Sequence, residues 1–410
     1  MKTILTNCTV IDCTGNPPMK DMTVVIESDK IAELRPGVHQ HAAEEGERVL
    51  DLEGGYVLPG LWNVHGHLGD LILDPKHLLE TESAIDYAIR AGRNAMDALR
   101  VGVTGIRVVA DGHFADIAWK RAFDTGVFVG PRLFVCGKGI NATGGHGHDK
   151  IGTVSVDGPY EMRKAVRENL KNGVDWIKLM VTGGVATAGE AMEEPQLFLD
   201  EIQAATEAAH AKGKKVTVHA WGSGGIKAAI RGGVDCIEHG LLDDEAIELM
   251  LENEVFYVPT LVVTQNIEGE KGIREMYPEF MIEKCLAFAK EHREGFQKAV
   301  KAGVKIACGA DDNPVADFTL MEIEHLVKAG MMEMKALAAA TKIAADLCGV
   351  GDRLGTVEVG KLADLIAVSA NPLEDISNIW NLKLVLKGGT RVQTRMSEGV
   401  VDFWELYLKP

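Results

Sequence analysis

The chain has 410 residues, of which 46% are hydrophobic and 25% are charged. This composition allows a large buried core and argues against disorder. The formal net charge of −17 makes nucleic acid and anionic membranes poor partners, so we expect neither. No apolar run is long enough to cross a bilayer, and the first residues lack the layout of a signal peptide.

The 7 cysteines are odd in number and form no CxxC motif. We interpret them as reduced, mostly buried thiols, and therefore predict a cytoplasmic protein. A contact between Cys8 and Cys13 is compatible with the sequence, although nothing in the sequence requires one.

The two ends of the chain differ in character from its middle. Residues 1–59 contain short strand-like runs and turns, such as TILTNCTVID and MTVVIESDKIAELRPG. Residues 355–400 repeat this character in GTVEVG, DLIAVS and KLVLKGG. We therefore predict one small β-sandwich-like module built from both termini, comprising residues 1–59 and 355–410.

In residues 60–354, amphipathic stretches that end in glycine alternate with short apolar runs. Glycine suits the position just after a helix, and continuous apolar runs are typical of parallel strands covered on both faces. The apolar runs are LWNVHGH, GIRVVA, RLFVCG, DWIKLMV, KVTVHA, DCIEHG, VFYVPTL and VKIACGAD. Eight strands alternating with helices predict an α/β fold, specifically a (β/α)8 TIM barrel.

Two histidines end the first apolar run, in the sequence NVHGHLG. Residues i and i+2 of a strand point to the same side, so His65 and His67 would project together. An isolated pair of this kind can equally be two polar residues at a strand end. Further ligands are needed to favour a metal site.

Lys178 lies inside the apolar run DWIKLMV. A buried lysine is costly unless it is neutralised or paired. One interpretation places its amine at the strand end, in water. The other makes it a metal ligand, because a lysine carboxylated by CO2 offers two anionic oxygens that can bridge two cations, whereas a free ammonium cannot bind one.

Three more polar residues end later runs: His219 in VTVHA, His239 in CIEHG and Asp311 in CGAD. Active sites of parallel barrels lie at this edge. Taken singly, each histidine could be a satisfied core residue and the aspartate could cap a helix. Together with the lysine and the first two histidines, they place six acceptable ligands at one rim, which predicts a metal site.

This set of residues resembles the ligand set of the binuclear metal-dependent amidohydrolase superfamily, and the likeness covers nearly the whole chain. It is carried by VLPGLWNVHGHLG, IKLMVTGG, CIEHG and GKLADLIAVSANPLEDI. The segments NATGGHGHD and IKLMVTGGVAT are also similar to a branch of Xaa-Pro dipeptidase-like and carboxypeptidase-like enzymes. That resemblance implies removal of a C-terminal amino acid from a dipeptide or an N-acyl amino acid.

The resemblance further implies two divalent metal ions. We expect zinc, which imidazole and carboxylate ligands suit, although manganese or cobalt would also fit. The implied ligands are His65, His67 and Asp311 for one ion, followed by His219 and His239 for the other. Carboxylated Lys178 and a hydroxide would bridge the two ions. The hydroxide would attack the scissile carbonyl, and Asp311 would carry its proton to the leaving amine.

Four residues are candidates for contact with the substrate. His146 lies in the glycine-rich run TGGHGHDK, and we expect it to be catalytic and to bind the substrate carbonyl or carboxylate; the alternative is a flexible polar loop. Trp221 offers a broad apolar face, or it could simply pack under a loop. Arg107 and His113 could bind a carboxylate, although Arg107 lies within a run and could form a buried structural pair.

Two other functions stay open at this point. One is a ring-opening hydrolase that acts on a cyclic amide or an imidazolone, similar to imidazolonepropionase. The other is a non-catalytic protein on the same fold. A deaminase is less favoured, because the related deaminases typically lack the lysine found here at Lys178. The expected partner is a small molecule or dipeptide, and a homo-oligomer is left open because related enzymes are often oligomeric.

Overall fold

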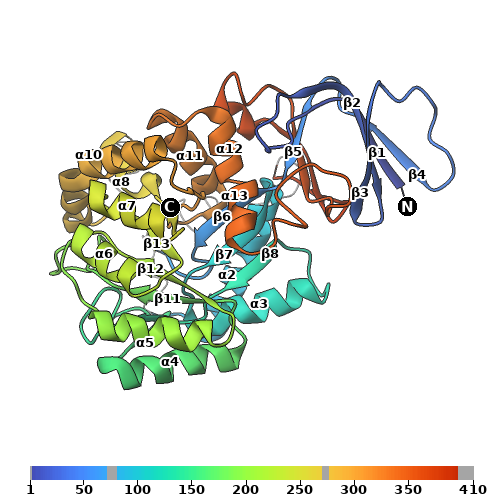
Figure 1. Cartoon of the computed structure of the whole chain (residues 1–410). Coiled ribbons are helices and arrows are strands. Elements are labelled where there is room, and N and C mark those ends of the chain that lie inside the picture. The colour runs from blue at the N-terminus through green and yellow to red at the C-terminus, as the bar shows by residue number, and fades with distance from the viewer. Residues whose placement is uncertain (1, 72–80, 270–276, 396–410) are drawn as a thin grey trace.

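Strands from both ends of the chain form one sheet in the computed structural model, which describes residues 2–71, 81–269 and 277–395. The sheet order is β17-β16-β15-β5-β1-β2-β3, with β4 paired to β1. Figure 1 shows the amino-terminal strands of this sheet at one end of the molecule, away from most of the helices. The strands are β1 (Lys2–Val10), β2 (Met19–Glu27), β3 (Lys30–Pro36), β4 (Glu47–Asp51), β5 (Tyr56–Pro59), β15 (Leu365–Val368), β16 (Leu382–Lys387) and β17 (Thr390–Val392).

The two ends of the chain meet where β5 pairs antiparallel with β15, from Leu365 opposite Pro59 to Val368 opposite Tyr56. Apolar side chains of this sheet, among them Leu5, form a cluster of their own. The strands from both ends of the chain are hydrogen-bonded into a single sheet. The sandwich-like arrangement and the domain boundaries at residues 59/60 and 354/355 therefore stay predictions. Residues 396–410 of the predicted module lie outside the described residues.

The remaining strands are parallel and form two sheets. β6, β7 and β8 form the first, and the order of the second is β10-β9-β11-β12-β13-β14. All residues of β6, β7 and β11 are buried, as expected for strands that are covered on both faces. The strands are β6 (Leu61–Gly66), β7 (Val103–Val108), β8 (Arg132–Val135), β9 (Gly139–Asn141), β10 (Thr153–Ser155), β11 (Trp176–Met180), β12 (Lys215–His219), β13 (Cys236–Glu238) and β14 (Phe256–Val258).

The eighth predicted strand, VKIACGAD, is not a regular strand. It forms one isolated parallel bridge, between Ile306 and Tyr257 of β14. Further backbone hydrogen bonds join it to β6, where Val64 N donates to Cys308 O at 2.9 Å and Asp311 N donates to His65 O at 2.9 Å. Because its bonds are divided between two neighbours, the segment builds no continuous ladder with either. It nevertheless runs between β14 and β6.

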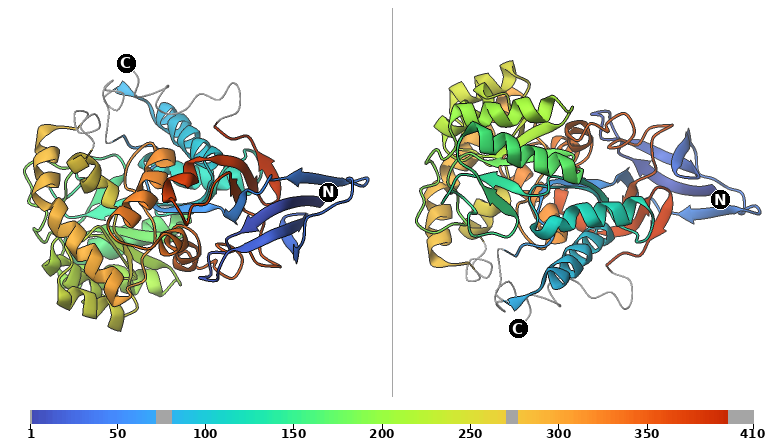
Figure 2. Two further views of the ribbon diagram at one scale, coloured as in Figure 1. Left: turned by 90° about the horizontal axis from the view of Figure 1, so that it is seen from above. Right: turned by 90° about the horizontal axis from the view of Figure 1, so that it is seen from below.

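Helices alternate with the parallel strands and lie around them (Figures 1 and 2). Several end as the glycine pattern predicts: Gly173 and Gly303 adopt φ of 92° and 85° just after α4 and α10. The helices are α2 (Ala84–Arg100), η1 (Gly112–Phe114), α3 (Ala115–Asp124), α4 (Gly158–Asn172), α5 (Leu199–His210), α6 (Ser223–Arg231), α7 (Asp244–Glu252), α8 (Leu261–Gly269), α10 (Glu279–Ala302), α11 (Val315–Lys328), α12 (Glu333–Ala339), α13 (Lys342–Leu347) and η2 (Ile376–Trp380).

Two further features bear on the sequence predictions. Cys8, Cys13 and the other five cysteines are free thiols. Within residues 2–71, 81–269 and 277–395, no helix combines the length and the apolar character needed to cross a membrane.

The packing of β7 against β6 can be tested at Gly105. A Cβ atom added there would lie 2.4 Å from the ring of Trp62, which is 1% exposed. Forcing extra volume into a filled core costs about 1–3 kcal/mol, so Gly105→Ala should lower the free energy of unfolding in urea by about 2 kcal/mol. Gly224→Ala in α6 is the matched control, because its Cβ would meet nothing within 4 Å. Equal stability of the two variants would contradict this packing.

Candidate metal centre

The structure brings the six predicted metal ligands together. Five of them line one cavity, and the sixth, His239, lies against two of the others, with ring centroids 4.9 Å from His65 and 4.5 Å from His219. Each side chain is placed by the carboxyl end of a parallel strand or by the eighth run. The residues that line the cavity are His65, His67, Lys178, His219 and Asp311.

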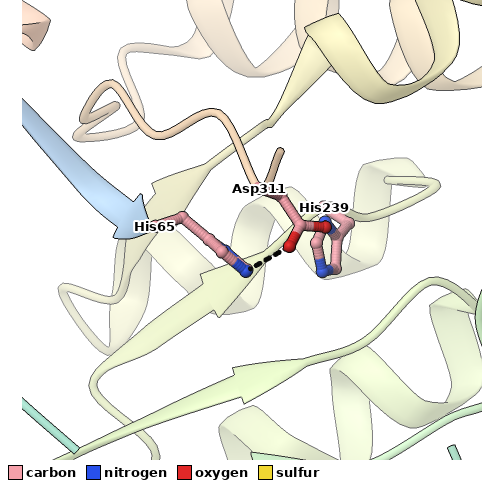
Figure 3. Close-up of side chains that lie close together, drawn as sticks. All are labelled: His65, His239 and Asp311. Atoms are coloured by element: carbon pink, nitrogen blue, oxygen red, sulfur yellow. Dashed lines mark ion pairs between the residues drawn. The ribbon is translucent and has the colours of Figure 1, made fainter. Parts of the chain in front are cut away.

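Asp311 is the centre of the first group of ligands. Its Oδ1 lies 2.9 Å from His65 Nε2 and 3.1 Å from His67 Nε2. Figure 3 shows His65 and Asp311 joined by this contact, with His239 beside them. Ligand atoms of His65, His239 and Asp311 all lie within 4.8 Å of one another. Three side chains from distant parts of the sequence therefore face one point.

The backbone at two of these residues is unusual. His239 has a φ of 69° and Asp311 a φ of 58°, both in the left-handed region that L-residues rarely adopt. Such a conformation costs on the order of 1 kcal/mol and persists where the surrounding structure enforces it. His239 directly follows β13, and Asp311 ends the eighth run, where its backbone N donates to His65 O at 2.9 Å. A left-handed residue therefore stands at the end of each of these two segments.

Burial sets the charge of the ligands. It lowers the pKa values of His219 and His239 well below the ordinary value, so both imidazoles are neutral at neutral pH. Burial alone would raise the pKa of Asp311, but the neighbouring His65 and His239 outweigh it and hold that pKa well below its ordinary value. Neutral imidazole and ionised carboxylate are the forms that bind a cation.

Lys178 is 1% exposed and lies within β11, where burial lowers its pKa. Its Nζ has no hydrogen-bond partner among the described residues, although it is fully buried. The same is true of His239 Nε2. Buried polar atoms without partners are rare and costly, so they indicate groups that a ligand completes. With histidine and carboxylate donors beside them, these atoms fit a divalent metal site; ligation itself stays a prediction.

The ligands are oriented by residues that the sequence analysis did not single out. His65 Nδ1 lies 2.7 Å from Glu238 Oε2, and His239 Nδ1 lies 2.7 Å from Thr260 Oγ1. His67 Nδ1 lies 2.9 Å from the backbone oxygen of Ala110. Such partners fix which ring nitrogen faces the metal. The signal for Glu238 was its place beside a predicted ligand in CIEHG; Thr260 carried no comparable signal.

His146 lies at the cavity, as the glycine-rich run suggested. Its ring stacks on that of His219 with centroids 4.1 Å apart and planes 13° apart. Its Nδ1 is hydrogen-bonded to Glu190, and its backbone N donates to Gln196 Oε1 at 2.7 Å. The close stack depends on Gly184, because a Cβ there would lie 2.4 Å from the His146 ring. His146 is thus held rigidly beside the predicted ligands.

Three predicted substrate contacts are not offered by this geometry. Arg107 is fully buried, and its Nη2 forms an ion pair with Glu238 at 2.5 Å, below the ligands. Trp221 is fully buried and stacks on His239, with centroids 5.0 Å apart and planes 7° apart. His113 is exposed in η1 and meets the edge of Tyr87. These three residues are absent from the lining of the described cavity. Arg107 and Trp221 are packed in the interior, and His113 lies at the surface.

Other residues take their place at the cavity. Asp70, Lys150, Tyr277 and Asp312 supply polar groups to its lining. The Tyr277 hydroxyl donates to Asp312, and burial raises the pKa of Asp312 to about 7. The sequence analysis did not single out Asp312, because nothing in the local pattern distinguishes a residue of a cavity wall from a helix cap.

Thr260 provides a test of the metal centre. Thr260→Val keeps the shape of the side chain but removes the hydrogen bond to His239, and loss of such a partner typically weakens metal binding about 10–100-fold. Metal content after dialysis against graded chelator would measure the effect. Thr264→Val is the control, because Thr264 is equally buried but bonds to His292 and not to a predicted ligand. Metal affinity equal to that of the unaltered protein would show that His239 is not a ligand.

Comparison with known proteins agrees with the predicted resemblance. The model of the Amidohydrolase family matches residues 56–392. An ochratoxinase from Aspergillus niger is 33% identical over 414 residues, which cover 91% of this chain and 83% of the relative. A solved structure of a Xaa-Pro dipeptidase with bound methionine is 35% identical with a TM-score of 0.88, and the match covers 96% of this chain and 100% of that chain.

A second solved structure, a prolidase complexed with N-methylphosphonate-L-proline, is 30% identical with a TM-score of 0.84. The match covers 96% of this chain and 100% of that chain. The residues matched by the family model include all strands of the two parallel sheets and all six predicted ligands. The chain therefore belongs to the amidohydrolase family, where its relatives are dipeptidase-like, and it is an enzyme that hydrolyses amide bonds.

Proposed function

We propose that this enzyme uses two divalent metal ions to release the C-terminal amino acid from a dipeptide or an N-acyl amino acid. The observation that carries the proposal is the buried Lys178 amine, which faces a cavity shared with four other predicted ligands and has no partner of its own among the described residues. The relatives named as a Xaa-Pro dipeptidase, a prolidase and an ochratoxinase support the choice of substrate class.

In this proposal the eight parallel segments close into a barrel, with the eighth run bridging β14 and β6. At the rim of the barrel, His65, His67 and Asp311 would hold one ion. His219 and His239 would hold the other. Lys178 would join the two sites after carboxylation by CO2. Its lowered pKa supports that step, because only the uncharged amine reacts with CO2. Zinc is the ion that this donor set suits best.

Divalent ions bound there would polarise the scissile carbonyl and lower the pKa of a water molecule towards about 7. Asp311 would accept a proton during attack and pass it to the leaving amine. Its lowered pKa keeps it ionised at neutral pH, so a carboxylate is present there. His65 and His67, which lie within 3.1 Å of its Oδ1, hold the carboxylate in place.

His146 would bind the substrate carbonyl or carboxylate through Nε2. Its other nitrogen, Nδ1, is engaged by Glu190, whose second carboxylate oxygen accepts a hydrogen bond of 2.8 Å from Gln196. The bond to Glu190 fixes the orientation of the ring and would leave Nε2 for the substrate.

The choice of substrate is tested by screening metal-loaded protein against dipeptides and N-acyl amino acids, with hydantoin and imidazolone analogues alongside. We expect hydrolysis of open-chain amides that carry a free carboxylate. Their α-carboxamide analogues should be poorer substrates if the carboxylate is recognised. Activity confined to ring compounds would instead favour the cyclic-amide hydrolase.

The bridging role of Lys178 predicts that Lys178→Ala loses bound metal and most of its turnover, because the two sites then lack their shared ligand. Metal content by mass spectrometry and kcat on the best amide substrate would measure both effects. Lys212→Ala, an exposed lysine, serves as the control. A Lys178→Ala protein that kept two ions and full turnover would rule out the bridge.

The proton transfer by Asp311 predicts a different outcome for Asp311→Asn. The amide keeps the shape of the side chain but cannot accept the proton, and loss of general acid–base catalysis typically costs about 10²–10⁴-fold in rate. We expect kcat to fall by this amount in variant protein that still contains metal. Asp244→Asn is a surface control, since that carboxylate bonds only to Lys298. Unchanged kcat would exclude Asp311 as the proton carrier.

A further inference from the structure

A single hydrophobic cluster forms much of the cavity wall beside the candidate metal centre. Its members that face the cavity come from three separate parts of the chain: the segment after β6, the loop after β11, and the helix pair α8 and α10. Tyr277 also belongs to the cluster and the cavity, but its hydroxyl donates to Asp312; we call the other members the apolar wall: Leu71, Val185, Val263, Ile267, Met281 and Cys285. All six are buried, and none carries a charge.

The apolar wall reaches the metal centre through Trp221. That indole belongs to the same cluster and stacks in parallel on His239 at 5.0 Å. A substrate with its scissile carbonyl at the predicted ligands would therefore place a neighbouring group against the wall. The polar groups of the same cavity lie on several segments: His146 and Lys150 on residues 146–153, Asp70 beside Leu71, and Tyr277 with Asp312.

Lys284 holds the apolar wall together. Its Nζ donates to the backbone oxygens of Gly184 at 2.8 Å and Thr187 at 2.7 Å. These bonds attach the loop that carries Val185 to α10, next to Cys285 and one turn from Met281. The wall is thus a built surface with a fixed shape, since its two main parts are joined by charge-assisted hydrogen bonds.

We propose that the apolar wall is a specificity subsite for a bulky apolar group, aromatic, branched aliphatic or thioether, attached beside the scissile amide. This inference rests on the proposed function and deepens it. Apolar surface that leaves water on binding favours such groups, and a charged group would be buried here without a partner. The free carboxylate of the substrate would accordingly lie towards Lys150 and His146, away from the wall.

Two substrate series test the proposal with metal-loaded enzyme. The first varies the amino acid, from N-acetylglycine to N-acetylleucine and N-acetylphenylalanine. The second varies the acyl group, from N-acetylglycine to N-benzoylglycine. In at least one series, we expect kcat/KM to rise about tenfold or more with the bulky group, since a single methylene in an apolar pocket already discriminates about tenfold. Equal kcat/KM across both series would overturn the proposal.

A variant ties that preference to the wall. Met281→Gln is close in volume but adds a buried polar group, so it should lower the ratio of kcat/KM for the preferred bulky substrate to kcat/KM for N-acetylglycine about tenfold, mainly through KM of the bulky substrate. Met162→Gln is the matched control, because Met162 is equally buried, in α4, and does not line the cavity. If Met281→Gln does not fold, Val263→Thr makes the same test with an isosteric change.

Failure of the proposed function gives a different result. If the metal-loaded enzyme hydrolyses no acyl amino acid and no dipeptide, the proposed reaction is wrong, and the wall is then tested by binding alone. Calorimetry with N-acetylphenylalanine, N-benzoylglycine and N-acetylglycine would show tighter binding of a bulky ligand if the subsite exists. Equal affinities for all three would overturn it. A similar loss of bulky-substrate preference in Met162→Gln and Met281→Gln would overturn it too.

Discussion

The ion pair between Arg107 and Glu238 is the interaction on which the rest of the site depends. Both side chains are fully buried, and Glu238 also bonds to the ring of His65 and to the hydroxyl of Thr217. A carboxylate is stable in such a place only when several partners satisfy it. Because its partners come from three different strands, the pair links the strands and fixes His65 with its Nε2 towards Asp311.

Two buried polar atoms near this pair, Lys178 Nζ and His239 Nε2, have no hydrogen-bond partner among the described residues. The backbones of His239 and Asp311 are also left-handed. Each of these features opposes folding. Unpartnered buried atoms and left-handed residues also occur elsewhere among the described residues, so it is their position beside histidine and carboxylate donors that indicates ligand binding here.

The clustering of the candidate ligands could be predicted, because strand periodicity and burial determine which residues of the chain lie together in space. His219 and His239 end apolar runs, and parallel strands bring such ends to one edge. Glu238 could not be assigned a role, since its contact with Arg107 depends on the register between strands, which a single sequence does not reveal. For the same reason the sequence left open whether Arg107 binds a substrate carboxylate or forms a buried pair, and the structure shows the pair. The eighth run looked like a strand because its composition does not show that its hydrogen bonds are divided between two neighbours.

Met281 on α10 shows a further limit, because helical periodicity predicts that it is buried but not whether it faces a filled core or a cavity. Its true setting connects specificity to metal chemistry. The cluster that contains Met281 also backs the stack of Trp221 on His239, and burial is the main cause of the lowered pKa of His239. In the proposal, the wall receives an apolar group of the substrate, while Trp221 of the same cluster covers one face of the His239 imidazole.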